Sequence, residues 1–106
     1  MKKDLRFGFT ESNIVDLKAK LESLFGFIFE EHESSYYGGR YFKFRSDMAG
    51  EFILQANFDL IEGEWIEEAH QDRPLLLNIS DAPDAEGIQK ALARITDCKL
   101  INEIAR

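Results

Sequence analysis

The chain is short of the residues on which several classes of protein depend. Its 106 residues include one cysteine, two prolines and one tryptophan. A lone cysteine, Cys98, cannot form an internal disulfide, which suits a reducing compartment. We expect this thiol to be buried and inert, although Lys99 beside it could lower its pKa.

Long apolar runs are missing as well. No run approaches the roughly 20 apolar residues that a membrane span needs. The first residues carry positive charge but lack the apolar stretch that follows it in a signal peptide. We therefore expect a cytoplasmic protein that has no membrane partner.

Basic residues are scarce in comparison with acidic ones. Thirteen Lys and Arg stand against 20 Asp and Glu, and the net charge is −7. An acidic surface repels the phosphate backbone, so nucleic acid is excluded as a partner. The same charge attracts a basic protein and speeds its approach.

Sequence patterns of catalytic and metal sites are also missing. His32 and His70 stand at no spacing typical of metal ligands, and no serine lies in a G-x-S-x-G context. Gly38-Gly39 lacks the glycine pattern of a phosphate-binding loop. The many carboxylates lie in polar stretches, where water keeps them ionised and unsuited to acid–base catalysis. We expect no enzymatic activity, no cofactor and no bound metal.

What the chain does contain is enough for one packed core. Apolar residues make up 44% of the sequence and include nine Phe, which predicts a single domain over residues 1–106. Apolar periodicity of two predicts strands, and spacing of three and four predicts helices. The expected strands are 5–9, 27–33, 36–45, 52–58, 75–79 and 99–104, and the expected helices are 14–25 and 85–95.

This order, β-α-β-β-β-β-α-β, predicts an α+β fold. We expect a two-layer sandwich with a mainly antiparallel sheet of five to six strands and two helices on one face. The layout resembles the ferredoxin-like βαββαβ arrangement with one extra strand. The expected helix ends are Thr10 or Ser12 as the first cap, Gly26 as its terminator, and Asp81 or Asp84 before the second helix.

The connection from Asp59 to Asp72 departs from these patterns. It holds six acidic residues, no Lys or Arg, and the only tryptophan, Trp65. Long connections in compact domains are often functional. A buried aromatic anchor with carboxylates at its rim suits a basic protein partner. The alternative is a solvated loop, with a short helix, in which Trp65 and Ile66 pack onto the core.

The predicted partner-binding residues are those of this connection together with two tyrosines before it: Asp59, Glu62, Glu64, Trp65, Glu67, Glu68, Asp72, Tyr36 and Tyr37. A second acidic cluster, Glu30, Glu31 and Glu33, lies close to the tyrosines in the sequence. It either extends the binding face or protects an edge strand from aggregation. Arg40, Lys43 and Arg45 are expected to pair with it across strands.

Three short motifs accompany the acidic connection. They are an aromatic-Gly-Gly strand at 36–42 (YYGGRYF), a Gly-Glu-x-Ile-Leu strand at 50–59 (GEFILQANFD) and the segment 73–77 (RPLLL). Over about residues 30–106, this pattern resembles the bacterial immunity proteins of contact-dependent growth inhibition and other polymorphic-toxin systems. The resemblance implies an inhibitor that binds one cognate toxin domain, often a basic nuclease, and masks its active site or a nearby surface.

Two other hypotheses stay open. The chain could be a small ferredoxin-like regulatory domain that binds a metabolite, with polar groups from the turn at residues 10–13. It could also be a metal-assisted hydrolase built on its carboxylates. In each case we expect a monomer or a weak homodimer.

Overall fold

The computed structural model describes residues 2–34, 39–95 and 97–105. Apolar alternation and helical spacing produce elements close to those expected. In chain order they are β1 (Lys3–Phe9), α1 (Ile14–Phe25), β2 (Glu30–Ser34), β3 (Gly39–Ser46), β4 (Gly50–Ala56), β5 (Phe58–Asp59), β6 (Glu64–Trp65), the short 3-10 helix η2 (Glu68–His70), β7 (Leu75–Ala82), α2 (Ala85–Leu92) and β8 (Cys98–Ala105).

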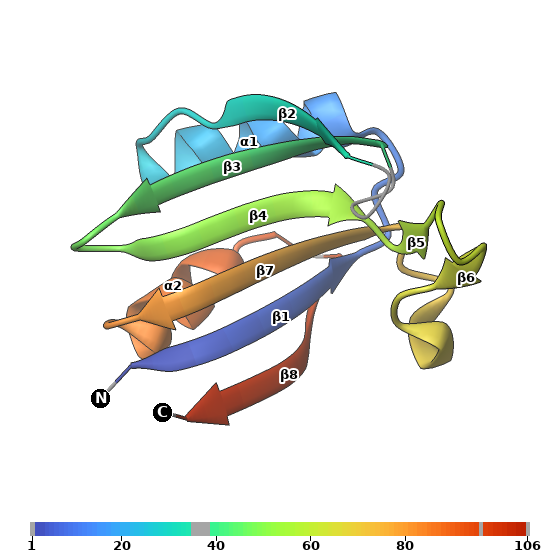
Figure 1. Ribbon diagram of the computed structural model, residues 1–106. Coiled ribbons are helices and arrows are strands. Elements are labelled where there is room, and N and C mark those ends of the chain that lie inside the picture. The colour runs from blue at the N-terminus through green and yellow to red at the C-terminus, as the bar shows by residue number, and fades with distance from the viewer. Residues whose placement is uncertain (1, 35–38, 96, 106) are drawn as a thin grey trace.

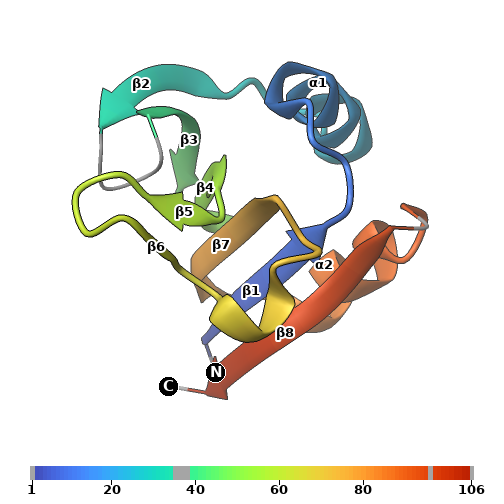
Figure 2. The same ribbon diagram turned by 90° about the vertical axis from the view of Figure 1, so that its right-hand side faces the viewer.

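Six of the strands form one antiparallel sheet in the order β2-β3-β4-β7-β1-β8, and β5 and β6 form a small sheet of their own. Both helices cover the same face of the large sheet, and the two chain ends lie side by side (Figures 1 and 2). The predicted α+β sandwich is therefore confirmed, including the order of its strands and helices along the chain.

The ferredoxin-like part of the sheet consists of β8-β1-β7-β4, with α1 after β1 and α2 after β7. Two strands, β2 and β3, extend it beyond β4, where the expected layout gained one. Both strands of this pair were expected, as 27–33 and 36–45, so the six expected strands already exceeded the ferredoxin-like four by two and the expectation of one extra strand was too low.

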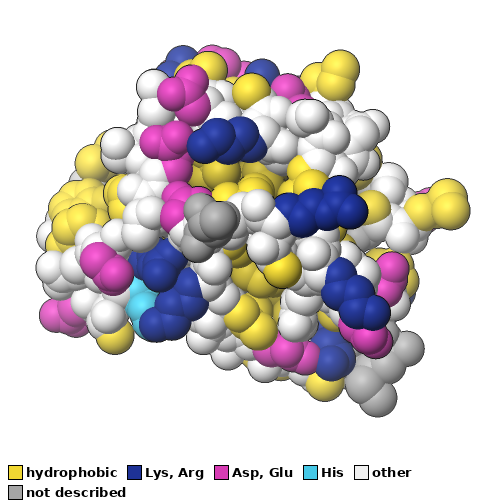
Figure 3. Space-filling view, turned by 180° about the vertical axis from the view of Figure 1, so that it is seen from behind, with side chains coloured by type: hydrophobic (Ala, Val, Ile, Leu, Met, Phe, Trp, Pro, Cys, Tyr) yellow, Lys and Arg dark blue, Asp and Glu magenta, His cyan; other side chains and the backbone are white. Residues whose placement is uncertain are grey.

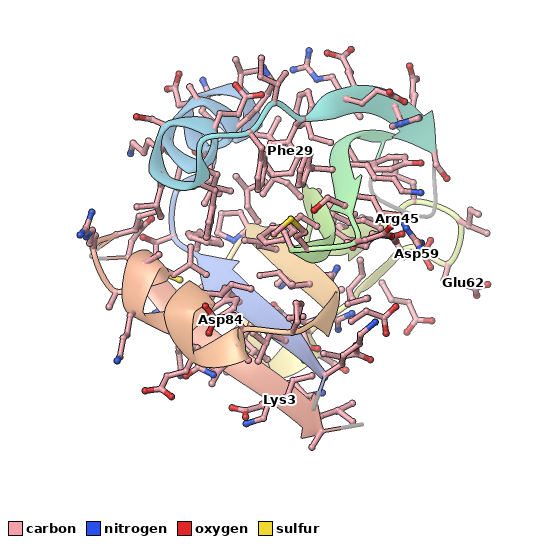
Figure 4. All side chains as sticks on the ribbon, turned by 90° about the vertical axis from the view of Figure 1, so that its left-hand side faces the viewer. Lys3, Phe29, Arg45, Asp59, Glu62 and Asp84 are labelled. Atoms are coloured by element: carbon pink, nitrogen blue, oxygen red, sulfur yellow. The ribbon has the colours of Figure 1, made fainter. Side chains whose placement is uncertain are left out.

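The core lies between the sheet and the helices. Leu17 and Leu21 of α1 are fully buried against it. Phenylalanines fill the space between α1 and the extending strands: the rings of Phe27 and Phe44 stack at 3.9 Å, and Phe27 meets Phe52 edge to face at 5.1 Å. Phe29 points into this interior (Figure 4). Aromatic contacts of this kind add to the burial of apolar area and fix the two extra strands against the helix.

The helix ends show one correction. Asn13, and neither Thr10 nor Ser12, caps α1, because its side-chain oxygen accepts from the amides of Val15 and Asp16 at 3.0 and 3.1 Å. Thr10 instead donates to Asp97 at 3.1 Å.

Two further predicted ends, at Gly26 and Asp84, are confirmed, whereas the end expected at residue 95 is not. Gly26 ends α1 with a positive φ of 73°, which glycine adopts without strain. Asp84 caps α2 by accepting from the amide of Gly87 at 3.0 Å. This helix ends at Leu92, so Ile95 follows it rather than belonging to it.

A close approach at Gly8 shapes the face of the sheet that the helices leave open. A Cβ at this position would lie 2.7 Å from Cδ1 of Ile101 and 3.0 Å from Cβ of Arg73. The side chain of Arg73 passes here to donate from Nη1 to the carbonyl oxygen of Asp97. Glycine in the middle of β1 therefore lets this side chain cross the strand.

Replacing Gly8 by Ala should destabilise the fold. The added methyl group has no space, and overpacking of this kind costs about 1–3 kcal/mol of unfolding free energy. Urea denaturation measures the change, with Ser23→Ala on the exposed surface of α1 as a control expected within about 0.5 kcal/mol of the parent. Equal stability of the two variants would show that the strand can shift to accept a side chain.

Candidate functional site

The connection between β4 and β7 projects from one end of the sheet, on the side away from the helices (Figures 1 and 2). Its first part is the acidic hairpin, residues 58–65, in which Phe58 pairs with Trp65 and Asp59 with Glu64. The Asp59 carboxylate accepts from the amides of Ile61 and Glu62 at 2.8 and 3.3 Å. Short-range hydrogen bonds thus set the turn of this hairpin.

Three large apolar side chains are exposed on the acidic hairpin. Leu60 and Ile61 each retain 55% of their accessible surface, and Trp65 retains 37%. The Trp65 ring stands edge to face against Phe58, with centroids 5.6 Å apart. Trp65 is therefore supported from one side within the hairpin and open to contact from the other.

Exposed carboxylates follow these apolar residues along the hairpin and into η2. Glu62, Glu64 and Glu68 are exposed, and none has a basic partner among the described residues. Figure 4 shows Glu62 pointing away from the body of the molecule. Asp72 differs from these, because its carboxylate lies 3.8 Å from Nε of Arg73. The predicted cluster thus contains three acids that are open to an external cation.

Glu67 takes a different place from the other predicted acids. Its carboxylate lies 2.5 Å from Nη1 of Arg6 on the open face of the sheet, and both side chains are largely covered. Its backbone amide donates to Oδ1 of Asn57 at 2.7 Å. Glu67 therefore attaches the connection to the sheet.

Asn57 is the residue that sequence reasoning missed. It is completely buried and lies directly after β4. Besides accepting from Glu67, its side-chain amide donates to the carbonyl oxygens of Arg73, His70 and Glu67 at 3.0, 3.1 and 3.4 Å. Its own backbone amide donates to Pro74 at 2.8 Å. One side chain thus holds three separate points of the connection.

The second acidic cluster lies on β2, which is an edge strand of the sheet. Glu31 and Glu33 are exposed and lack a basic partner among the residues that the structure describes, while Glu30 lies 2.8 Å from His32. The expected pairing with Arg40, Lys43 and Arg45 is not made: Lys43 and Arg45 pair with Glu51 of β4 at 3.9 and 3.2 Å, and the Arg40 guanidinium lies over the Phe42 ring at 5.9 Å. Glu51 lies directly across from Arg45 on β4, on the face of the sheet that also carries Lys43.

The start of β3 brings this edge close to the acidic hairpin. A Cβ built on Gly39 would lie 3.9 Å from Cδ1 of Leu60. The hairpin and the end of the β2–β3 pair therefore share one end of the sheet (Figure 1). Tyr36 and Tyr37, also predicted to bind a partner, lie outside the described residues.

Other candidate chemistry is sparse in the described part of the chain. It contains no group of three or more His, Cys, Asp or Glu side chains placed to hold a metal ion. His32 stacks on Tyr41 at 5.3 Å. Neither helix of the described segments has the length and apolarity needed to cross a membrane.

Two hollows are relevant to ligand binding. One of about 260 Å³ lies over β1, β7 and β8 on the open face and is lined in part by Asp4, Arg6, Asn78 and Asn102. The other, of about 630 Å³, lies between α1 and the segment that follows α2, on the helical side of the molecule shown in Figure 3. The turn at residues 10–13 offers less than expected, because Thr10 and Asn13 make the internal bonds described above.

Cys98 is half-buried and has an unusually weak acidity. Burial raises the pKa of its thiol to about 12, and the neighbouring Asp97 carboxylate adds to the rise more than Arg73 offsets it. Lys99 is exposed and does not lower the pKa, contrary to the alternative considered above. The thiol is therefore protonated throughout the physiological range.

This thiol should react slowly with iodoacetamide at neutral pH. Only the thiolate attacks, and the rate should rise steadily with pH toward about 12 instead of levelling near pH 9. Mass spectrometry of the alkylated chain measures the rate, with free cysteine as the reference. A rate equal to that of free cysteine at pH 8 would contradict the assignment.

Comparison with protein-family models, with curated proteins and with solved structures returned no match to this chain.

Proposed function

We propose that this protein is a cytoplasmic immunity protein that binds a basic toxin domain, such as a nuclease, and neutralises it without catalysis. The supporting observation is the surface of the acidic hairpin, where exposed Leu60, Ile61 and Trp65 lie among carboxylates that have no cation partner in the described chain. An apolar centre with a charged rim is the usual arrangement of a protein interface.

The two parts of this surface have different tasks. The apolar tip supplies the area that is removed from water, and the Trp65 ring is the large rigid anchor within it. Glu62, Glu64 and Glu68 attract a basic partner over a longer range and select against acidic ones. Glu31 and Glu33 on the neighbouring edge strand add to the same field.

This arrangement explains how such a protein would inhibit a nuclease. A nuclease must present Lys and Arg to phosphate, so its active site is a basic surface. Carboxylates held beside an apolar wedge can occupy those cations while the wedge blocks access. The inhibitor needs no reactive group and acts as a monomer or a weak homodimer.

Substitutions on the hairpin test the proposal. The chain is co-expressed with the product of the adjacent upstream gene, and growth and complex formation are measured. Trp65→Ala should weaken binding about 10- to 100-fold, and Glu62→Lys with Glu64→Lys should slow association and reduce its salt dependence. Glu86→Lys, a charge reversal on exposed α2, is the matched control and should bind like the parent.

Growth rescue and a co-purified complex with the parent chain support the proposal. Wild-type affinity in all the hairpin variants would remove this surface from the interface. No rescue and no complex with the parent chain would favour the regulatory hypothesis.

The open-face hollow favours a small polar metabolite as the second candidate. Asp4 and Arg6 place opposite charges on one wall, with the Asn78 and Asn102 amides beside them. Its volume of about 260 Å³ is near the lower limit of small-ligand sites.

A thermal-shift panel of amino acids and nucleotides tests this candidate. A ligand at 100 times its Kd should raise the unfolding free energy by about 2.7 kcal/mol. Asn102→Ala, on the exposed wall, should reduce that shift. Unchanged melting with the whole panel would discard the hypothesis.

A further inference from the structure

The acidic hairpin is too small to hold its own position. Its two strands have two residues each, and such a short hairpin is not stable alone in water. Its tip must nevertheless present Trp65 and the carboxylates together if it is to bind as one surface. Contacts from outside the hairpin must therefore fix its position relative to the sheet.

We infer that Asn57 is the positioning residue of the acidic hairpin: its buried side-chain amide fixes the hairpin in its binding orientation before a partner arrives. The inference rests on the proposed function, because it takes the hairpin as the contact surface. Asn57 is itself fully buried and does not reach that surface.

The contacts of Asn57 hold the part of the connection that follows the acidic hairpin, and so fix the base of the hairpin. Its amide bonds to Glu67, His70 and Arg73, which are 10, 13 and 16 residues further along the chain. These points lie before, within and after the turn that η2 makes toward β7. Both the oxygen and the nitrogen of the amide are used, so no other side chain of this size could make the same set of bonds.

A chain of polar side chains forms a second attachment. Arg6 on β1 donates to Glu67 at 2.5 Å and to Oδ1 of Asn78 on β7 at 2.6 Å. Asn78 in turn donates to Oε1 of Gln55 on β4 at 2.5 Å. Glu67 is therefore held at its backbone by Asn57 and at its carboxylate by the open face of the sheet.

Fixing the hairpin in advance strengthens binding. A flexible connection loses conformational freedom when a partner orders it, and that loss is subtracted from the affinity. Releasing the clamp should weaken binding at least about tenfold, even though the Trp65 tip and its carboxylates are unchanged. The surface charges of the variant are unchanged, so the salt dependence of its association rate should stay that of the parent. The affinity that is lost should appear mainly as faster dissociation of the complex.

The first test needs no partner. NMR relaxation of the free wild-type chain should give backbone order parameters near 0.85 for residues 58–73, as for the sheet, whereas values below about 0.6 would overturn the inference. Trp65 is the only tryptophan, so its fluorescence anisotropy reports on the same segment.

The second test uses a matched pair of substitutions. Asn57→Asp keeps the acceptor for Glu67 but replaces the donating nitrogen with an oxygen that faces three carbonyl oxygens. Asn13→Asp makes the same chemical change at the exposed cap of α1, where a carboxylate oxygen can accept the same two amide hydrogen bonds. Only Asn57→Asp should lower the order parameters of the hairpin and weaken binding to the product of the upstream gene. If Asn57→Asp does not fold, Asn57→Ala takes its place in the test, because it removes the same hydrogen bonds without burying a charge.

The outcomes separate the two proposals. A rigid hairpin that becomes mobile and loses affinity in Asn57→Asp or Asn57→Ala supports the positioning role. Unchanged affinity in a variant whose hairpin has become mobile overturns that role and leaves the proposed function standing. Absence of binding by the wild-type chain, with a rigid hairpin, overturns the proposed function, and the positioning role with it.

Discussion

The burial of one face of the sheet beneath two helices is the constraint on which the rest of the structure depends. Leu5, Phe7 and Phe9 face the helices, so Arg6 and Gly8 between them face the opposite side. Most buried apolar side chains are thereby placed in one layer, at roughly 25 cal/mol for each Å² removed from water. The other face carries polar side chains together with Leu76 and Ile101, and it receives the long connection between β4 and β7 at one end (Figure 2).

That connection cannot be held by an apolar core of its own, and a buried amide replaces one. Burying the Asn57 side chain without partners would cost several kcal/mol, but all of its hydrogen-bonding groups are satisfied. A satisfied buried polar group specifies one arrangement more sharply than apolar packing does, because a shifted arrangement loses several bonds together. The Asn57 amide thus attaches the connection to the end of β4 and fixes the orientation of the acidic hairpin.

The fold could be predicted from the sequence because an element that buries one face has apolar residues at regular spacing. The spacing of two predicted β7 from Leu75, Leu77 and Ile79, and the spacing of four predicted α2 from Ile88 and Leu92. Choices that depend on distant neighbours could not be predicted. Thr10, Ser12 and Asn13 are all good helix caps, and Asp97, far along the chain, takes Thr10 away from that role. Local pattern identified the acidic connection at 59–72 but not the hairpin within it. Only the folded structure separates Glu67 and Asn57, which are bonded to each other at its base, from Glu62 and Glu64, which are exposed.

The charges on the hairpin also answer a problem that its apolar tip creates. Exposed Leu60, Ile61 and Trp65 together would favour association between copies of the chain. Two such tips can meet only by bringing their carboxylates together, and like charges at close range oppose that contact. A basic partner meets no such repulsion and gains both the apolar area and the ion pairs. On the proposed function, the carboxylates therefore have two effects. They attract a basic protein to the apolar surface, and they oppose contact between two copies of the chain, which is the selectivity that the proposed inhibitor would need in the absence of its target.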